Sequence, residues 1–352
     1  MNLEIQVLNT PKKSNNRLLL IYTGGTFGMV TDDDTLGVKP VNWNELKEYF
    51  PALKRINSSI DLVWLGDAMD SSDIRPEHWI KWSKLIEFQY NNYDGFIFIH
   101  GTDTMAFSSS AMSFFLQGIQ KPVIFTGAQL PISATRSDAR DNLLSSIELA
   151  SMKNSSGKSY IQEVCIYFNN KLMRGNRCKK TQSAQFDAFE SPNYGNLAET
   201  GINIIFNENL ILQKEQKPVQ TFEFYDSKID ILKLYPGFCN DETFEKLTNS
   251  KSKALILESY GSGNAPHSLE LIDALNQKID EGKIVFNISQ CLQGEVQQSR
   301  YHTGKQLQEI GVISGGDITF EASVTKMMWA LGNFDLLTAK KLMSESVCGE
   351  MS

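Results

Sequence analysis

The feature that most constrains the fold is a series of short, uninterrupted apolar runs. Each is followed by glycine or polar residues and then by a segment of helical composition. In the first half of the chain these runs end at Tyr22, Gly66, His100, Thr126 and Phe168. Continuous apolar strands that alternate with helices are typical of a parallel sheet covered on both faces. The pattern therefore predicts an α/β fold.

A second series of the same kind follows, with apolar runs that end at Tyr235, Tyr260 and Ser289. A polar stretch rich in lysine, glutamate and glutamine separates the two series. The chain has 352 residues, more than the roughly 100–200 of one ordinary domain. We therefore expect a larger N-terminal parallel-sheet α/β domain, a linker and a smaller C-terminal α/β domain. The predicted bounds are 1–206, 207–221 and 222–352.

Helices are expected between the runs, and Pro76 with Glu77 suits the first turn of one of them. The predicted helices cover about 76–93, 104–117, 136–152, 241–249, 266–281 and 323–331.

Composition excludes several classes of function. The net charge is -7 with no basic cluster, which argues against a nucleic-acid surface. The five cysteines form no CxxC pair and the four histidines are dispersed, so neither a disulfide framework nor a metal site is expected. The first apolar run, Leu18–Tyr22, is too short for a signal peptide or a membrane span. We therefore expect a cytoplasmic protein that contacts no membrane.

The first chemical motif, Thr23-Gly24-Gly25-Thr26, follows the first strand directly. Two adjacent glycines permit a tight turn from which a side chain projects beside bare backbone. Thr26 could therefore stand as a nucleophile, or it could be a capping threonine in an ordinary glycine turn.

Two further motifs also lie at strand ends, where open α/β sheets bind their ligands. His100-Gly101-Thr102-Asp103-Thr104 places a hydroxyl beside a carboxylate. Thr102 could carry or activate a nucleophilic oxygen and Asp103 could bind an ammonium group. Alternatively, Asp103 or Thr104 could simply cap the next helix.

The segment Asp70-Ser71-Ser72 offers groups that suit the α-carboxylate and α-amino group of a small zwitterion. It could also cap the helix near Pro76, and both readings can hold together.

Taken together, six motifs resemble those of the type I, cytoplasmic bacterial L-asparaginases in content and order. They are TGGTxGM, MDSSD, HGTDTM, TGAQLP, NNKLMRGNR and SYGSGNAP. The resemblance runs from about Leu18 to Gly349. It implies two α/β domains and hydrolysis of L-asparagine to L-aspartate and ammonia, with no metal and no cofactor.

The resemblance also implies roles for individual residues. Thr26 matches the nucleophile, and Thr102 matches a second catalytic threonine beside Asp103. Lys180 matches their basic partner. Asp70, Ser71 and Ser72 match the segment that holds the substrate. Asn264 matches a residue that reaches a site across a subunit interface, since members of the family are homodimers or homotetramers.

The implied mechanism is a double displacement. Thr26 attacks the side-chain amide carbon, ammonia leaves, and water hydrolyses the aspartyl ester. The Thr102–Lys180–Asp103 group relays protons in both steps. The assignment of Thr26 rather than Thr102 as the attacking residue stays open from sequence.

One departure from the family pattern concerns a tyrosine in the loop after TGGT. The segment Val30–Pro40 contains none. Tyr301 is the candidate replacement, although it could be an ordinary partly buried tyrosine. The loop itself is acidic and contains glycine, and we expect it to be a mobile lid.

Two other functions remain open from sequence alone. One is the asparaginase-like subunit of a tRNA-dependent amidotransferase, which shares the threonine chemistry. The other is an amino-acid-binding module without catalysis, against which the presence of Thr26, Thr102, Asp103 and Lys180 argues.

Overall fold

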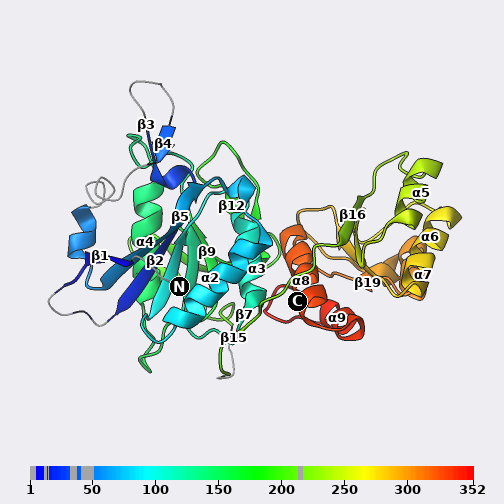
Figure 1. Cartoon of the computed structure of the whole chain (residues 1–352). Coiled ribbons are helices and arrows are strands. Elements are labelled where there is room, and N and C mark those ends of the chain that lie inside the picture. Colours follow the sequence, from blue (N-terminus) through cyan, green and yellow to red (C-terminus); the bar gives the residue numbers. More distant parts are fainter. Residues whose placement is uncertain (1–4, 12–13, 15, 32–37, 41–50, 213–216) are drawn as a thin grey trace. The chain divides into compact units, whose positions relative to one another are not determined.

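A computed structural model (Figure 1) describes residues 5–11, 14, 16–31, 38–40, 51–212 and 217–352. The chain forms two compact units, unit 1 (Met1–Thr221) and unit 2 (Phe222–Ser352). The stretch predicted to be a linker, 207–221, falls in unit 1. There the short strand β15 (Gln220–Thr221) pairs with β7 (Leu116–Gln117).

Unit 1 has one large sheet. Among the described residues its strands, in spatial order, are β1 (Ile5–Asn9), β5 (Ser59–Met69), β2 (Arg17–Gly24), β6 (Gly95–Ile99), β8 (Val123–Thr126), β9 (Val164–Phe168), β10 (Lys171–Arg174), β13 (Asn196–Thr200) and β14 (Ile204–Phe206). The five strands from β5 to β9 in this order are parallel. These are the five apolar runs of the sequence, so the prediction of a parallel-sheet α/β unit is confirmed.

The antiparallel edges of this sheet were not predicted. After β9 the chain reverses through Asn169 and Asn170, which have φ values of 45° and 66°. Asparagine tolerates this left-handed conformation, and two such residues form the tight turn that suits a hairpin. As a result β10 returns antiparallel to β9, with β13 and β14 beyond it.

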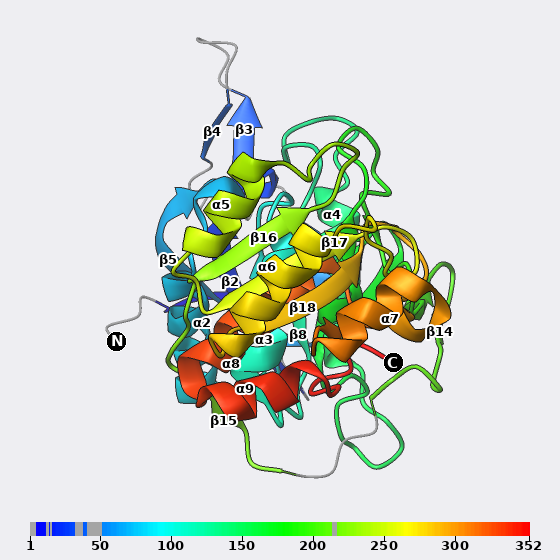
Figure 2. The same cartoon turned by 90° about the vertical axis from the view of Figure 1, so that its right-hand side faces the viewer.

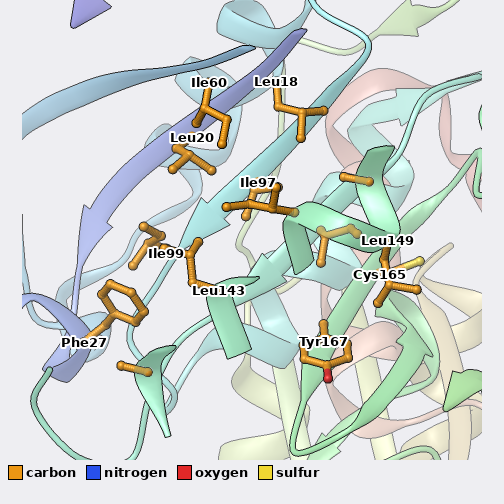
Figure 3. Packing of buried hydrophobic residues seen from close by; sticks show 14 of the residues in the cluster. Leu18, Leu20, Phe27, Ile60, Ile97, Ile99, Leu143, Leu149, Cys165 and Tyr167 are labelled. Atoms are coloured by element: carbon orange, nitrogen blue, oxygen red, sulfur yellow. The ribbon is translucent and has the colours of Figure 1, made fainter. Parts of the chain in front are cut away.

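Helices cover both faces of the sheet, as Figure 1 shows. They are α2 (Pro76–Gln89), α3 (Met105–Phe115) and α4 (Ala139–Ser151). Successive strand residues point to opposite faces. Leu18, Leu20 and Ile97 therefore pack in one cluster with Leu143 of α4, as Figure 3 shows. On the other face Phe98 contacts Trp82 of α2.

Unit 2 is a smaller α/β structure. Its described strands, in spatial order, are β16 (Ile229–Lys233), β17 (Ala254–Ser259), β18 (Ile284–Ser289) and β19 (Ile313–Ser314), all parallel. Its helices are α5 (Asp241–Asn249), α6 (Leu269–Asp280), α7 (His302–Glu309), α8 (Phe320–Asn333) and α9 (Leu336–Met343). Figure 2 shows α5 and α6 in front of β16, β17 and β18. Leucines of both helices share a buried cluster with Leu255 and Leu257 of β17.

The helix bounds correct the sequence prediction in places. Helix α2 ends at Gln89 rather than near Tyr93. Helix α8 begins at Phe320 because Thr319 caps it by accepting the N–H of Ala322. Helices α7 and α9 were missed. None of the described helices is long and apolar enough to span a lipid bilayer.

A buried ion pair holds the end of the chain in unit 2. The Lys326 ammonium lies 2.6 Å from the Glu350 carboxylate, and both side chains are 0% exposed. Lys326 also donates to the carbonyl of Glu345 (2.6 Å), and Glu350 accepts the backbone N–H of Cys348 (2.7 Å). Each charge is thus hydrogen-bonded as well as paired, which is what a buried charge requires.

Replacing Lys326 by Met should destabilise unit 2 strongly. The substitution leaves the Glu350 carboxylate buried without its cation, which costs about 3–5 kcal/mol. Urea unfolding followed by circular dichroism measures the loss. Lys341→Met is the control, because its pair with Glu345 is solvent-exposed and is worth at most about 1 kcal/mol. Equal losses in the two variants would contradict the prediction.

Candidate active site

Three loops at the ends of parallel strands interlock in unit 1. Strand β2 ends at Gly24, and Gly24 and Gly25 have φ values of 122° and 88°, which glycine adopts without strain. A Cβ on Gly25 would lie 2.4 Å from the Cα of Gly101, in the loop after β6. The N–H of Gly25 donates to the carbonyl of Met69, the last residue of β5 (3.1 Å). The loops after β2, β5 and β6 therefore touch backbone to backbone.

Thr26 follows directly as the first residue of the short 3-10 turn η1 (Thr26–Gly28). Its side chain is partly buried, whereas Phe27 is 0% exposed and lies in the core beside α4 (Figure 3). The carbonyl of Phe27 accepts the N–H of Ile132 (3.2 Å), which ties the turn to the loop after β8. The glycine turn thus has a fixed place at the edge of the sheet.

Thr102 and Asp103 share one cation. The Nζ of Lys180 lies 2.8 Å from the Thr102 Oγ1 and 2.6 Å from the Asp103 Oδ1. Lys180 comes from the short strand β11 (Lys179–Lys180), which pairs with β12 (Phe189–Glu190). The Lys180 side chain is 18% exposed and that of Asp103 is 66% exposed. A hydroxyl, an ammonium and a carboxylate therefore form a hydrogen-bonded group open to solvent on one side.

The capping interpretation of this motif is only partly correct. Thr104 occupies the N-cap position of α3 but makes no side-chain capping bond. Its hydroxyl instead donates to the carbonyl of Ser71 (2.7 Å), and the N–H of Asp103 donates to the Ser71 Oγ (3.2 Å). These bonds join the loop after β6 to the loop after β5.

Asp70 caps the short turn η3 (Ser71–Asp73). Its Oδ1 accepts both the N–H and the hydroxyl of Ser72, each at 2.8 Å. These hydrogen bonds hold the pKa of the Asp70 carboxyl below its ordinary value. The prediction that this segment caps the helix near Pro76 is wrong, because Asp70 caps η3 and Arg75 is the N-cap of α2. Asp70 remains exposed beside the two serines.

His100 supports the loop from within the core. Its Nδ1 lies 2.6 Å from the Gly101 carbonyl, which can only accept, so Nδ1 carries the proton. Its Nε2 then accepts the Ser108 hydroxyl (3.0 Å), which itself accepts the Trp79 indole N–H (3.0 Å). Burial lowers the pKa of His100 to about 4. The imidazole is therefore neutral near pH 7.

Two predicted residues lie in unit 2. Asn264 and Tyr301 belong to neighbouring segments, because the Thr303 hydroxyl donates to the Asn264 Oδ1 (3.4 Å). Tyr301 precedes α7 and is 47% exposed, so it is not buried. The Arg300 guanidinium lies 5.6 Å from the centre of its ring.

The predicted lid lies partly outside the described residues. Strands β3 (Met29–Thr31) and β4 (Val38–Pro40) form its antiparallel base, and 32–37 are not described.

Sequence reasoning missed the roles of Gln129 and His100. The Thr102 hydroxyl donates to the Gln129 Oε1 (3.3 Å), and Gln129 belongs to the TGAQLP motif after β8. Its place just beyond a parallel strand was the available signal. Among the described residues, no three histidines, cysteines or acidic residues are grouped to hold a metal ion.

The chain is similar to known proteins over nearly its whole length. Residues 17–212 match the asparaginase N-terminal domain, and residues 228–343 match the glutaminase/asparaginase C-terminal domain. The chain belongs to the asparaginase family. It is 37% identical to L-asparaginase 1 of Escherichia coli over 340 residues, which is 95% of this chain and 98% of that protein.

The chain is also similar to a solved structure and to a more distant relative. L-asparaginase I from Vibrio cholerae superposes with a TM-score of 0.86 at 36% identity, covering 96% of this chain and 100% of that one. A glutamyl-tRNA(Gln) amidotransferase subunit of Pyrococcus abyssi is 30% identical over 95% of this chain but only 76% of its own length.

Acidification should destabilise the protein through His100. The unfolded histidine takes up a proton near pH 6.5, whereas the folded one does so only near pH 4. Stability from this group is therefore present above pH 6.5 and is lost as the pH falls toward 4, by about 3 kcal/mol in all. Urea unfolding between pH 4 and 7 should show a shallower acid loss for His100→Gln than for the wild type. Parallel pH curves for the two proteins would contradict this assignment.

Proposed function

We propose that this protein is an L-asparaginase, a hydrolase that converts L-asparagine to L-aspartate and ammonia through a threonine nucleophile. The observation that carries the proposal is the Lys180 ammonium shared by Thr102 and Asp103 beside the Gly24–Gly25 turn. The names of the relatives support it, because L-asparaginase 1 of Escherichia coli matches over 98% of its length. The amidotransferase subunit, matched over 76% of its length, is the less favoured alternative.

In the first step, the Thr26 Oγ1 attacks the side-chain amide carbon of asparagine and gives up its proton to the Thr102–Lys180–Asp103 group. The amide nitrogen takes up a proton, the C–N bond breaks, and ammonia leaves. The product is an aspartyl ester on Thr26. We infer that backbone N–H groups of the strand-end loops stabilise the tetrahedral oxyanion, at about 3–4 kcal/mol per donor.

In the second step, a water molecule attacks the ester carbon. Its proton passes to the Thr102–Lys180–Asp103 group, in which the Asp103 carboxylate is the final acceptor, and the Thr26 oxygen is released with a proton as L-aspartate forms. The 2.8 Å and 2.6 Å contacts of Lys180 support this relay, because protons move between groups within hydrogen-bond reach. The mechanism uses no metal and no cofactor.

The substrate is held as a zwitterion. Asp70, Ser71, Ser72 and Asp103 offer two carboxylates and two hydroxyls at adjoining strand ends, supported by the Thr104–Ser71 bond. The carboxylates suit the α-amino group, and the hydroxyls suit the α-carboxylate. We further propose that the protein is a cytoplasmic homodimer or homotetramer in which Asn264 completes the site of a neighbouring subunit.

Substitution of either threonine should abolish most of the ammonia release. Thr26→Ala removes the attacking oxygen and should lower kcat by about 10³-fold or more. Thr102→Val removes a proton-transfer group and should lower kcat by about 10²–10⁴-fold. Coupled ammonia assays with asparagine and with glutamine measure both effects and the choice of substrate.

The matched control is Thr126→Val. The Thr126 hydroxyl is buried and donates to the carbonyl of Tyr167 (3.0 Å), and it has no part in the proposed reaction. Its kcat should stay within about threefold of the wild type. Full activity in Thr26→Ala and Thr102→Val would refute the threonine mechanism.

Tyr301→Phe should lower kcat by more than about threefold, or roughly 0.6 kcal/mol, if this hydroxyl replaces the absent lid tyrosine. The control is Tyr235→Phe, an exposed tyrosine of the same unit that packs against Phe238. Steady-state kinetics on the two variants measure the effect. A loss of kcat smaller than threefold in Tyr301→Phe would mean that Tyr301 is an ordinary surface tyrosine with no catalytic role.

A further inference from the structure

Gln129 connects three parts of the proposed site. It lies just beyond β8, and its Oε1 accepts the Thr102 hydroxyl (3.3 Å) of the loop after β6. Its Nε2 donates to the carbonyls of Gln185 (3.0 Å) and Ser183 (3.4 Å), in the segment that follows Lys180. The mechanism proposed above gives this side chain no role.

The orientation of the Gln129 amide is determined by its partners. Carbonyl oxygens can only accept, so the amide nitrogen must face Gln185 and Ser183 and the amide oxygen must face Thr102. The backbone is held as well, because both oxygens of Asp138 accept the Gln129 N–H (3.0 Å each). Asp138 in turn accepts the side-chain amide of Asn142 on α4 (3.2 Å).

This arrangement determines where the Thr102 proton points. The Lys180 ammonium has three donors and no acceptor, so Thr102 cannot donate to it. The hydroxyl proton therefore goes to the Gln129 Oε1, and an oxygen lone pair of Thr102 faces Lys180. Without an amide oxygen at this position, the hydroxyl would be free to rotate among several directions.

We propose that Gln129 is a positioning residue that orients the Thr102 hydroxyl so that an oxygen lone pair faces the Lys180 ammonium and accepts its hydrogen bond. The proposal rests on the proposed asparaginase function and extends it. Gln129 acts through Thr102 and does not touch the substrate, so its loss should reduce kcat and leave KM nearly unchanged.

The two halves of the amide can be tested separately. Gln129→Leu removes both the acceptor for Thr102 and the donor to the two carbonyls. Gln129→Glu keeps an acceptor of the same shape but loses the donor. If alignment of Thr102 matters, the glutamate variant should recover activity. If only the hydrogen bonds from Gln129 to the Ser183 and Gln185 carbonyls matter, both variants should lose activity equally.

Steady-state kinetics with asparagine, together with thermal melting, provide the test. We expect kcat to fall at least tenfold in Gln129→Leu with KM within threefold of the wild type. We expect Gln129→Glu to stay within threefold in kcat while its melting temperature falls as in the leucine variant. The control is Gln162→Leu, whose amide donates to the Ser159 carbonyl elsewhere in unit 1 (3.1 Å) and whose loss should leave kcat unchanged.

Four results would overturn the proposal. Equal losses of kcat in both variants would mean that only the hydrogen bonds of Gln129 to the Ser183 and Gln185 carbonyls matter. A kcat for Gln129→Leu within threefold of the wild type would mean that Gln129 has no role in the reaction. A loss confined to KM would make Gln129 a substrate-binding group. A wild type that releases no ammonia from asparagine would refute the proposed function as well, whereas the other results leave that function intact.

Discussion

The candidate site depends on the close approach of two backbones at the edge of the main sheet. Gly25 and Gly101 lie so close that a Cβ on Gly25 would be 2.4 Å from the Cα of Gly101. This contact brings the turn that begins at Thr26 against the loop that carries Thr102. It is possible only because β2 and β6 are adjacent and parallel, so that their carboxyl ends meet at the same edge. The topology of the sheet thereby brings together the two loops that carry Thr26 and Thr102.

Hydrogen bonds between the loops add further contacts at this edge of the sheet. Ser71 accepts from Thr104 through its carbonyl and from Asp103 through its hydroxyl, and His100 holds the Gly101 carbonyl from the core side. Because His100 is fully buried, its neutral imidazole can satisfy Gly101 and Ser108 at once without the cost of a buried charge. Catalytic groups need such support, since small errors in their position reduce the rate steeply.

The charged part of the site is arranged differently from the buried ion pair of unit 2. Lys326 and Glu350 are wholly enclosed and serve the fold. Lys180 is mostly covered, but its partner Asp103 is 66% exposed and open to solvent. A small zwitterion can therefore reach the Asp103 carboxylate from solvent without disturbing the hydrogen bonds that hold the loops. The same feature leaves Lys180 between a hydroxyl and a carboxylate, which suits it to proton transfer in the proposed reaction.

The parallel strands, their alternation with helices and the strand-end position of each motif could be predicted from the amino-acid sequence alone. These follow from apolar runs, glycines and polar residues that act over a few neighbouring positions, and the family resemblance added the expected roles. The sequence did not reveal the antiparallel edge beyond Asn170, the cap that starts α8 at Phe320, or the partners of His100 and Gln129. Gln129 is 27 residues from Thr102, and Lys180 is 78 residues from it. Contacts over such separations arise only when the strands are ordered in the sheet, because the direction of a hydroxyl proton depends on which distant acceptors the tertiary structure brings within reach.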